Sequence, residues 1–170
     1  EWVTRPDLHF AVEIIDANTT DRSAILLAHT VMGHWFNTYL FTPLETDQQD
    51  NPLTDLDRTI SAARTTSTSL LLELEDIQHD YLFVVVRLEG EIVSVLGAAK
   101  GDTNDEFYID VSVSAPRNVL TPNAEGNIRG AGTAAVHELA RYLKEKGVKT
   151  LRSTVISQPS ARVKMKLGFK

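Results

Sequence analysis

Residues 127–135 read NIRGAGTAA, where Gly130 and Gly132 lead directly into an apolar pattern at helical spacing. Glycine lets backbone N–H groups approach a ligand closely. The first turn of a helix also carries unpaired N–H donors and a partial positive charge, which suits a pyrophosphate. The stretch therefore predicts an anion site at the start of a helix that runs from Gly130 to Lys146 and stops at Gly147.

The same glycines fit a loose dinucleotide-binding fingerprint, G-x-G-x-x-A. That alternative needs a strand running directly into the glycines and an acidic residue about 20 positions later. Here the polar loop Pro116–Ile128 precedes the glycines, and the strand after the helix carries Lys149 and Arg152 instead. These features argue against a nicotinamide-binding domain.

The elements around the turn predict a single α/β domain over residues 1–170 with a mixed sheet. One helical pattern follows the capping residues Thr19, Thr20 and Asp21, and Gly33 within it suggests two consecutive helices. A second helix begins at Thr54. The remaining expected elements are strands over 9–16, 81–88, 91–99, 106–113 and 148–155, and a short last helix over 159–167.

The strand over 106–113 alternates cleanly between apolar and polar residues. Because successive strand side chains point to opposite faces, its two sets should face opposite sides of the sheet. The expected apolar set is Phe107, Ile109, Val111 and Val113, and the polar set is Glu106, Tyr108, Asp110 and Ser112.

Residues 81–169 resemble the GNAT N-acetyltransferases. Their motif A, Gln/Arg-x-x-Gly-x-Gly/Ala, fits as Arg129-x-x-Gly132-x-Ala134 and nearly fits as Asn127-x-x-Gly130-x-Gly132. Their terminal pattern N-x-x-A-x-x-x-Y-x-x-x-G-F corresponds to SQPSARVKMKLGF at residues 157–169, and the hairpin at Glu89-Gly90 matches their second and third strands.

The resemblance implies a mixed, mostly antiparallel sheet flanked by helices, in an enzyme that moves acetyl from acetyl-CoA directly to a primary amine. Its turn would hold the pyrophosphate, and main-chain groups of the fourth strand would pair with the pantetheine arm. The absence of cysteine excludes a thiol acyl-enzyme. The implied coenzyme-binding residues are Val111, Ser112, Val113, Arg129, Gly130, Ala131, Gly132, Thr133, Ala134 and Ser157.

The sequence departs from the family at two positions and at its end. Ser157 stands where the family has asparagine, and Lys164 stands where it has a tyrosine that steadies the leaving thiolate. Lys164 is either an electrostatic replacement for that tyrosine or an exposed helix lysine. The departures leave open a catalytically impaired module that binds CoA or a protein. The family also continues past Gly-Phe, so the C-terminal strand is expected to be missing from a trimmed chain.

An alkyl amine acceptor sets a clear chemical demand. Its pKa of about 10.4 makes deprotonation at pH 7 cost about 4.6 kcal/mol, which a positioned base offsets. By resemblance the base comes from the fourth strand, where Glu106 and Asp110 share one face. The alternative is that both are rim carboxylates that meet solvent.

Charge is divided unevenly along the chain. Residues 129–170 hold ten Lys and Arg against two Glu, a net charge of +8. Because the whole chain carries −6, residues 1–128 carry a net charge of −14. The basic part suits the coenzyme phosphates and the acidic part a cationic small-molecule or protein amine, although both could simply be solvated faces. A nucleic-acid-binding module is the third alternative, disfavoured by a pI of about 5.3.

Other function classes find little support in the sequence. Apolar runs such as Leu82–Val86 are far shorter than the roughly 20 residues of a membrane helix. No basic-apolar leader opens the chain, and a cysteine-free chain is consistent with a reducing compartment, so a cytoplasmic location is expected. His29, His34 and His137 lack spaced partners, so we expect no metal site.

Overall fold

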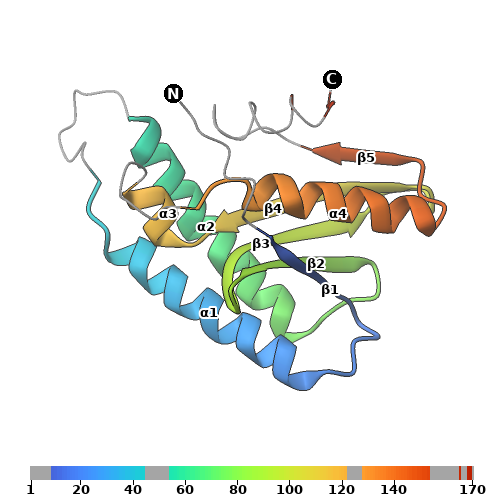
Figure 1. The fold of residues 1–170 in the computed structure, drawn as a ribbon, viewed down its shortest axis with the longest axis horizontal. Coiled ribbons are helices and arrows are strands. Elements are labelled where there is room, and N and C mark those ends of the chain that lie inside the picture. The colour runs from blue at the N-terminus through green and yellow to red at the C-terminus, as the bar shows by residue number, and fades with distance from the viewer. Residues whose placement is uncertain (1–8, 45–53, 122–127, 154–164, 166–167, 170) are drawn as a thin grey trace.

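The computed structural model describes residues 9–44, 54–121, 128–153, 165 and 168–169. Five strands form one sheet in the order β1-β2-β3-β4-β5 (Figure 1). All neighbours are antiparallel except β4 and β5, which are parallel. This confirms the expected mixed, mostly antiparallel sheet. The strands are β1 (Ala11–Ile15), β2 (Tyr81–Leu88), β3 (Glu91–Lys100), β4 (Glu106–Ser114) and β5 (Thr150–Ser153).

Helices cover both faces of the sheet. On one face lie α1 (Arg22–Phe41) and α2 (Asp55–Glu75), and on the other lies α4 (Ala131–Glu145); the short α3 (Pro116–Leu120) follows β4. Each face has its own apolar core. The α1/α2 face buries Met32, Tyr39, Leu70, Phe83 and Val95, whereas the α4 face buries Val84, Leu96, Ala135, Leu139 and Leu143.

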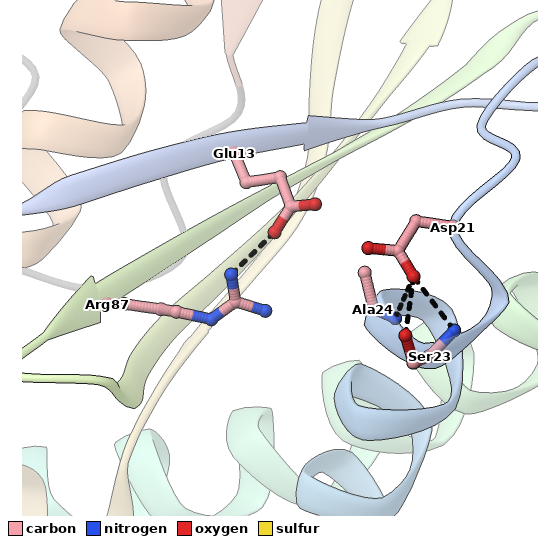
Figure 2. A network of polar contacts seen from close by, with 5 residues as sticks. All are labelled: Glu13, Asp21, Ser23, Ala24 and Arg87. Atoms are coloured by element: carbon pink, nitrogen blue, oxygen red, sulfur yellow. Dashed lines mark hydrogen bonds and ion pairs between the residues drawn. The ribbon is translucent and has the colours of Figure 1, made fainter.

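The helix α1 begins at a polar cap. The Asp21 carboxylate accepts hydrogen bonds from the N–H groups of Ser23 and Ala24 and from the Ser23 hydroxyl (Figure 2). The hydroxyl of Ser23 and then the N–H of Ala24 lower the pKa of Asp21. A lowered folded-state pKa means that this cap stabilises the fold above the carboxyl's unfolded pKa, and that the contribution is lost as pH falls through the folded value. Beside it, Arg87 of β2 donates to Glu13 of β1 at 2.6 Å.

Gly33 does not divide the first helix, so the expectation of two consecutive helices was wrong. A Cβ at Gly33 would lie 4.0 Å from a methyl group of Leu71 in α2, so the residue sits within the packed α1–α2 contact. Burial of the apolar stripe Ala24, Ala28, Met32, Trp35 and Tyr39 holds α1 continuous across the glycine.

Arg64 of α2 caps the other end of α1. Its guanidinium donates to the carbonyl oxygens of Tyr39 at 2.9 Å and Thr42 at 2.6 Å, two of the last carbonyls of α1. Those carbonyls have no partner within their own helix. The half-buried guanidinium therefore fixes the end of α1 against α2.

Arg64→Ala is expected to lower the free energy of unfolding by about 2 kcal/mol, because charge-assisted hydrogen bonds to the α1 carbonyls are lost. Urea denaturation measures the change. Arg58→Ala is the matched control on the same helix, since Arg58 makes an exposed ion pair with Asp55 at 3.5 Å and should cost under about 0.5 kcal/mol. Equal losses in the two variants would contradict the capping role.

Two further expectations from the sequence need correction, and a third concerns residues that the structure mostly does not describe. The segment Pro116–Ile128 is not entirely a loop, because Pro116, buried at the first helical position, starts α3. The described part of the last strand is Thr150–Ser153, shorter than the expected 148–155. The expected helix over 159–167 lies outside the described residues except for Met165.

Candidate active site

The fourth strand carries a β-bulge at Asp110. Across the β3–β4 pair, Gly97 lies opposite Val111 and Ala98 lies opposite Ile109, so Asp110 has no partner on β3. An extra residue in one strand bends it and shifts the alternation of its side chains. The bulge therefore divides β4 into two halves, and the odd-numbered residues of one half face the opposite side of the sheet from those of the other.

The simple alternation expected for β4 was wrong beyond the bulge. Phe107 and Ile109 pack into the core of the α4 face, but Val111 and Val113 pack into the core of the α1/α2 face. Ser112, opposite Leu96, moves to the α4 face and is exposed. Glu106, Tyr108 and Asp110 do share the α1/α2 face, as expected, because they precede the shift.

In the part of the chain that the structure describes, the β4–β5 pairing lies before the bulge. The recorded register runs from Glu106–Thr150 to Ile109–Ser153. Among the described residues, no strand lies beside residues 111–113 on the side away from β3. An extended ligand at that edge would add to the sheet as a strand does, through main-chain hydrogen bonds.

The glycine turn leads into α4 near the end of β4. Gly130 takes the N-cap position with φ of 94°, and no side chain caps the helix. The N–H of Ala134 bonds to the Gly130 carbonyl, while the N–H groups of Ala131, Gly132 and Thr133 precede the helical hydrogen-bond ladder. A Cβ on Gly132 would meet no atom within 4 Å. Packing within the described fold therefore gives no reason for a glycine there.

Asn118 of α3 positions this turn, since its side-chain oxygen accepts from the N–H of Ile128 at 3.1 Å. If the turn holds the pyrophosphate of acetyl-CoA, as the resemblance implies, Asn118→Ala should weaken acetyl-CoA binding about fivefold, because the residues before Gly130 lose one hydrogen bond of about 1 kcal/mol. Isothermal titration calorimetry measures the affinity. Unchanged binding would mean that the turn is held without Asn118.

Asp110 lies at the surface of the α1/α2 face, close to several polar groups. The buried hydroxyl of Tyr81 donates to Asp110 Oδ2 at 3.0 Å. Burial first, and then the negative charge of Asp110, raise the pKa of Tyr81 well above its ordinary value, and the carboxylate of Glu73 in α2 adds to the effect. The Tyr81 hydroxyl therefore stays protonated at neutral pH and is able to donate its hydrogen bond to Asp110.

Glu106 lies elsewhere on the same face. It is four residues before Asp110, about 13 Å along the strand, and its Oε1 accepts from Arg152 Nε of β5 at 2.9 Å. The structure thus does not bring the two predicted bases together. Among the described residues, Asp110 Oδ1 has no recorded partner, whereas Glu106 is held in an ion pair.

Several basic residues of the C-terminal quarter are also paired. Arg141 contacts Glu138 and Glu145 along α4, and Lys149 lies 3.8 Å from Asp105. Together with Arg152, these contacts neutralise part of the local positive charge. Arg129 directly precedes the N-cap residue Gly130 of α4, and Lys144 lies in the last turn of the helix. Ser157 and Lys164 lie outside the described residues, so their roles remain predictions.

Sequence reasoning missed Tyr81 and Gly97. Tyr81 begins a strand of apolar residues, so its pattern indicated core only, and Gly97 interrupts β3 without a turn signal. A glycine inside an otherwise apolar strand does signal close approach of another group. Within the described ranges, no group of three or more His, Asp or Glu side chains is placed to hold a metal ion, and none of the described helices is long and apolar enough to span a membrane.

Comparison with known proteins gives a match in structure only. No protein-family model and no curated protein matches the sequence. An aminoglycoside acetyltransferase from an uncultured soil sample, solved with sisomicin, superposes with a TM-score of 0.55 at 13% identity, over 94% of this chain and 88% of that one. The aminoglycoside N-acetyltransferase AAC(6')-Iy, solved with a CoA–acetylneamine bisubstrate analogue, gives 0.53 at 12%, over 95% and 91%.

A third solved structure supports the same fold. A predicted acetyltransferase of Clostridium acetobutylicum, solved with acetyl-CoA, gives a TM-score of 0.51 at 14% identity, over 95% of this chain and 90% of that one. Others of this group are described as GNAT-family acetyltransferases. The chain has the GNAT fold, which confirms the fold implied by the resemblance of residues 81–169.

Proposed function

We propose that the protein is an N-acetyltransferase that moves acetyl from acetyl-CoA directly to a primary amine. One observation carries the proposal, and it concerns the part of the chain that the structure describes. There, no side chain caps the start of α4, no strand pairs with residues 111–113 on the side away from β3, and the two features occur together in a GNAT fold. One feature offers N–H donors to a pyrophosphate, and the other offers main-chain groups to an extended arm.

The proposed coenzyme contacts follow from this arrangement. The N–H groups of Ala131, Gly132 and Thr133 would receive the pyrophosphate, and Arg129, Gly130 and Ala134 would shape the turn around it. The edge at Val111, Ser112 and Val113 would pair with the pantetheine arm. Ser157 is carried over only from the family pattern.

In the proposed reaction, the amine nitrogen attacks the thioester carbon to form the new C–N bond, and the C–S bond then breaks. Before the attack, the ammonium form gives one proton to Asp110, directly or through one water. The electron pair of the broken bond leaves on sulfur, and the thiolate then takes the second proton from the nitrogen. A thiol pKa near 8.5 makes that thiolate a tolerable leaving group. Lys164 is proposed to stabilise it electrostatically.

We propose a small cationic amine as the acceptor. Three observations favour it: the −14 charge of residues 1–128, the neighbouring carboxylates of Asp110 and Glu73, and the aminoglycosides named for two solved relatives of the fold. We propose a cytoplasmic location, for which the cysteine-free composition is suitable.

Calorimetry with acetyl-CoA, followed by thiol release over a panel of aminoglycosides, polyamines and lysine peptides, tests this function. We expect micromolar binding and amine-dependent release of CoA. Binding without release for any amine would favour the alternative of a CoA-binding module, which Lys164 in place of the family tyrosine suggests. No binding at millimolar acetyl-CoA would overturn both.

A further inference from the structure

One residue from each of three neighbouring strands lies at the same place on the α1/α2 face. Tyr81 opens β2, Gly97 lies in the second half of β3, and Asp110 forms the bulge of β4. The Tyr81 hydroxyl reaches Asp110 Oδ2 at 3.0 Å across the intervening strand. The contact therefore spans two strand spacings, which few side chains can bridge.

Because Gly97 has no side chain, it leaves the space that the Tyr81 ring needs to pass over β3. A Cβ at position 97 would lie 2.9 Å from Tyr81 Cζ and 3.0 Å from Cε1, inside the contact limit of carbon atoms. Glycine weakens a strand interior by about 0.5–1 kcal/mol relative to alanine. The passage of the Tyr81 ring over β3 explains why a glycine occupies this place.

The ring of Tyr81 is held firmly. It is 5% exposed, and its centroid lies 5.0 Å from that of the fully buried Phe83 in a tilted pair. Asp110, by contrast, is exposed. Among the described residues, the Tyr81 hydroxyl is the one hydrogen-bond partner recorded for Asp110, so Oδ1 is left for a group arriving from solvent.

We propose that Tyr81 is a positioning residue that orients the Asp110 carboxylate toward the acceptor amine, with Gly97 as the clearance that permits it. The hydroxyl donates to Oδ2 and thereby directs Oδ1 outward to accept the amine proton. In this arrangement Tyr81 would act through Asp110 and would contact neither substrate. This inference rests on the proposed acetyl transfer.

The test compares Tyr81→Phe, Asp110→Asn and the double variant in the full chain. Tyr81→Phe keeps the ring and removes only the hydroxyl, so kcat with a saturating amine should fall about tenfold, while the KM for acetyl-CoA stays unchanged. In the Asp110→Asn background, removing the hydroxyl should change kcat less than about twofold, because residues that act through one another are not additive. A further tenfold loss in the double variant would overturn the proposal.

Two additional variants separate positioning from simple destabilisation. Tyr39→Phe also removes a buried hydroxyl, one that donates to the Ser114 carbonyl at 2.6 Å, and should leave kcat within about twofold of wild type. Gly97→Ala keeps the Tyr81 hydroxyl but displaces it, so it should reproduce the kcat loss of Tyr81→Phe. An active wild type with unchanged kcat in Tyr81→Phe overturns this inference alone, whereas a wild type that acetylates no amine overturns the proposed function with it.

Discussion

Gly132→Asp should make the protein more stable and yet nearly unable to bind acetyl-CoA. Position 132 lies in the first turn of α4, in open space. A carboxylate there interacts favourably with the helix dipole, and replacing glycine removes its entropic cost, so the free energy of unfolding should rise by about 1 kcal/mol. Thermal denaturation without ligand measures this gain.

The same carboxylate would face the pyrophosphate. Two like charges about 5 Å apart repel by about 3 kcal/mol at an effective dielectric constant of about 20, which corresponds to at least about a 100-fold loss of affinity. Gly132→Ala is the matched control, since it stabilises the helix without adding charge and should weaken binding far less. Unchanged acetyl-CoA affinity in Gly132→Asp would place the coenzyme elsewhere.

Asp110→Asn should lower kcat/KM for the amine at pH 7 by about 100-fold, the lower end of what a general base contributes. The effect should shrink at pH 9, because about 100 times more of the amine is then already deprotonated. Binding of acetyl-CoA, measured by calorimetry, should not change. Steady-state rates at the two pH values give the comparison.

Glu106→Gln is the matched control for that experiment. Glu106 lies on the same strand and the same face but is paired with Arg152, about 13 Å from Asp110. Its removal should change kcat/KM by less than about threefold at either pH, since the Arg152 side chain of the pair is exposed and ion pairs near the surface contribute little. A loss equal to that of Asp110→Asn, or a loss in Asp110→Asn that does not depend on pH, would remove Asp110 as the base.

Local patterns predicted the parts of the fold that depend on nearby residues. The hairpin at Glu89-Gly90, the N-caps at Asp21 and Thr54 and the start of α4 at Gly130 all follow from short-range chemistry. The resemblance to GNAT proteins added the mostly antiparallel character of the sheet and the helices that flank it, which no local pattern could supply.

The predictions for Gly33 and for the faces of β4 were wrong because tertiary packing overrides local preference there. Gly33 lies inside a helix because α2 packs against it, and the side chains of β4 change faces because a bulge inserts Asp110 between paired residues. Alternation in the sequence cannot reveal a bulge, since the apolar residues on either side still alternate. The partners of Asp110 and Glu106 were equally hidden, because Tyr81 and Arg152 are distant in sequence and approach only through strand pairing.

The bulge in β4 also has a mechanical consequence. The residue that would receive the acceptor's proton and the edge that would carry the donor's arm are adjacent in one strand, Asp110 and then 111–113, anchored on either side by Ile109 and Val113 in two different cores. The spacing between the two substrates would therefore be set by a single rigid backbone segment. A change in the length of a loop elsewhere would then leave the alignment of donor and acceptor undisturbed.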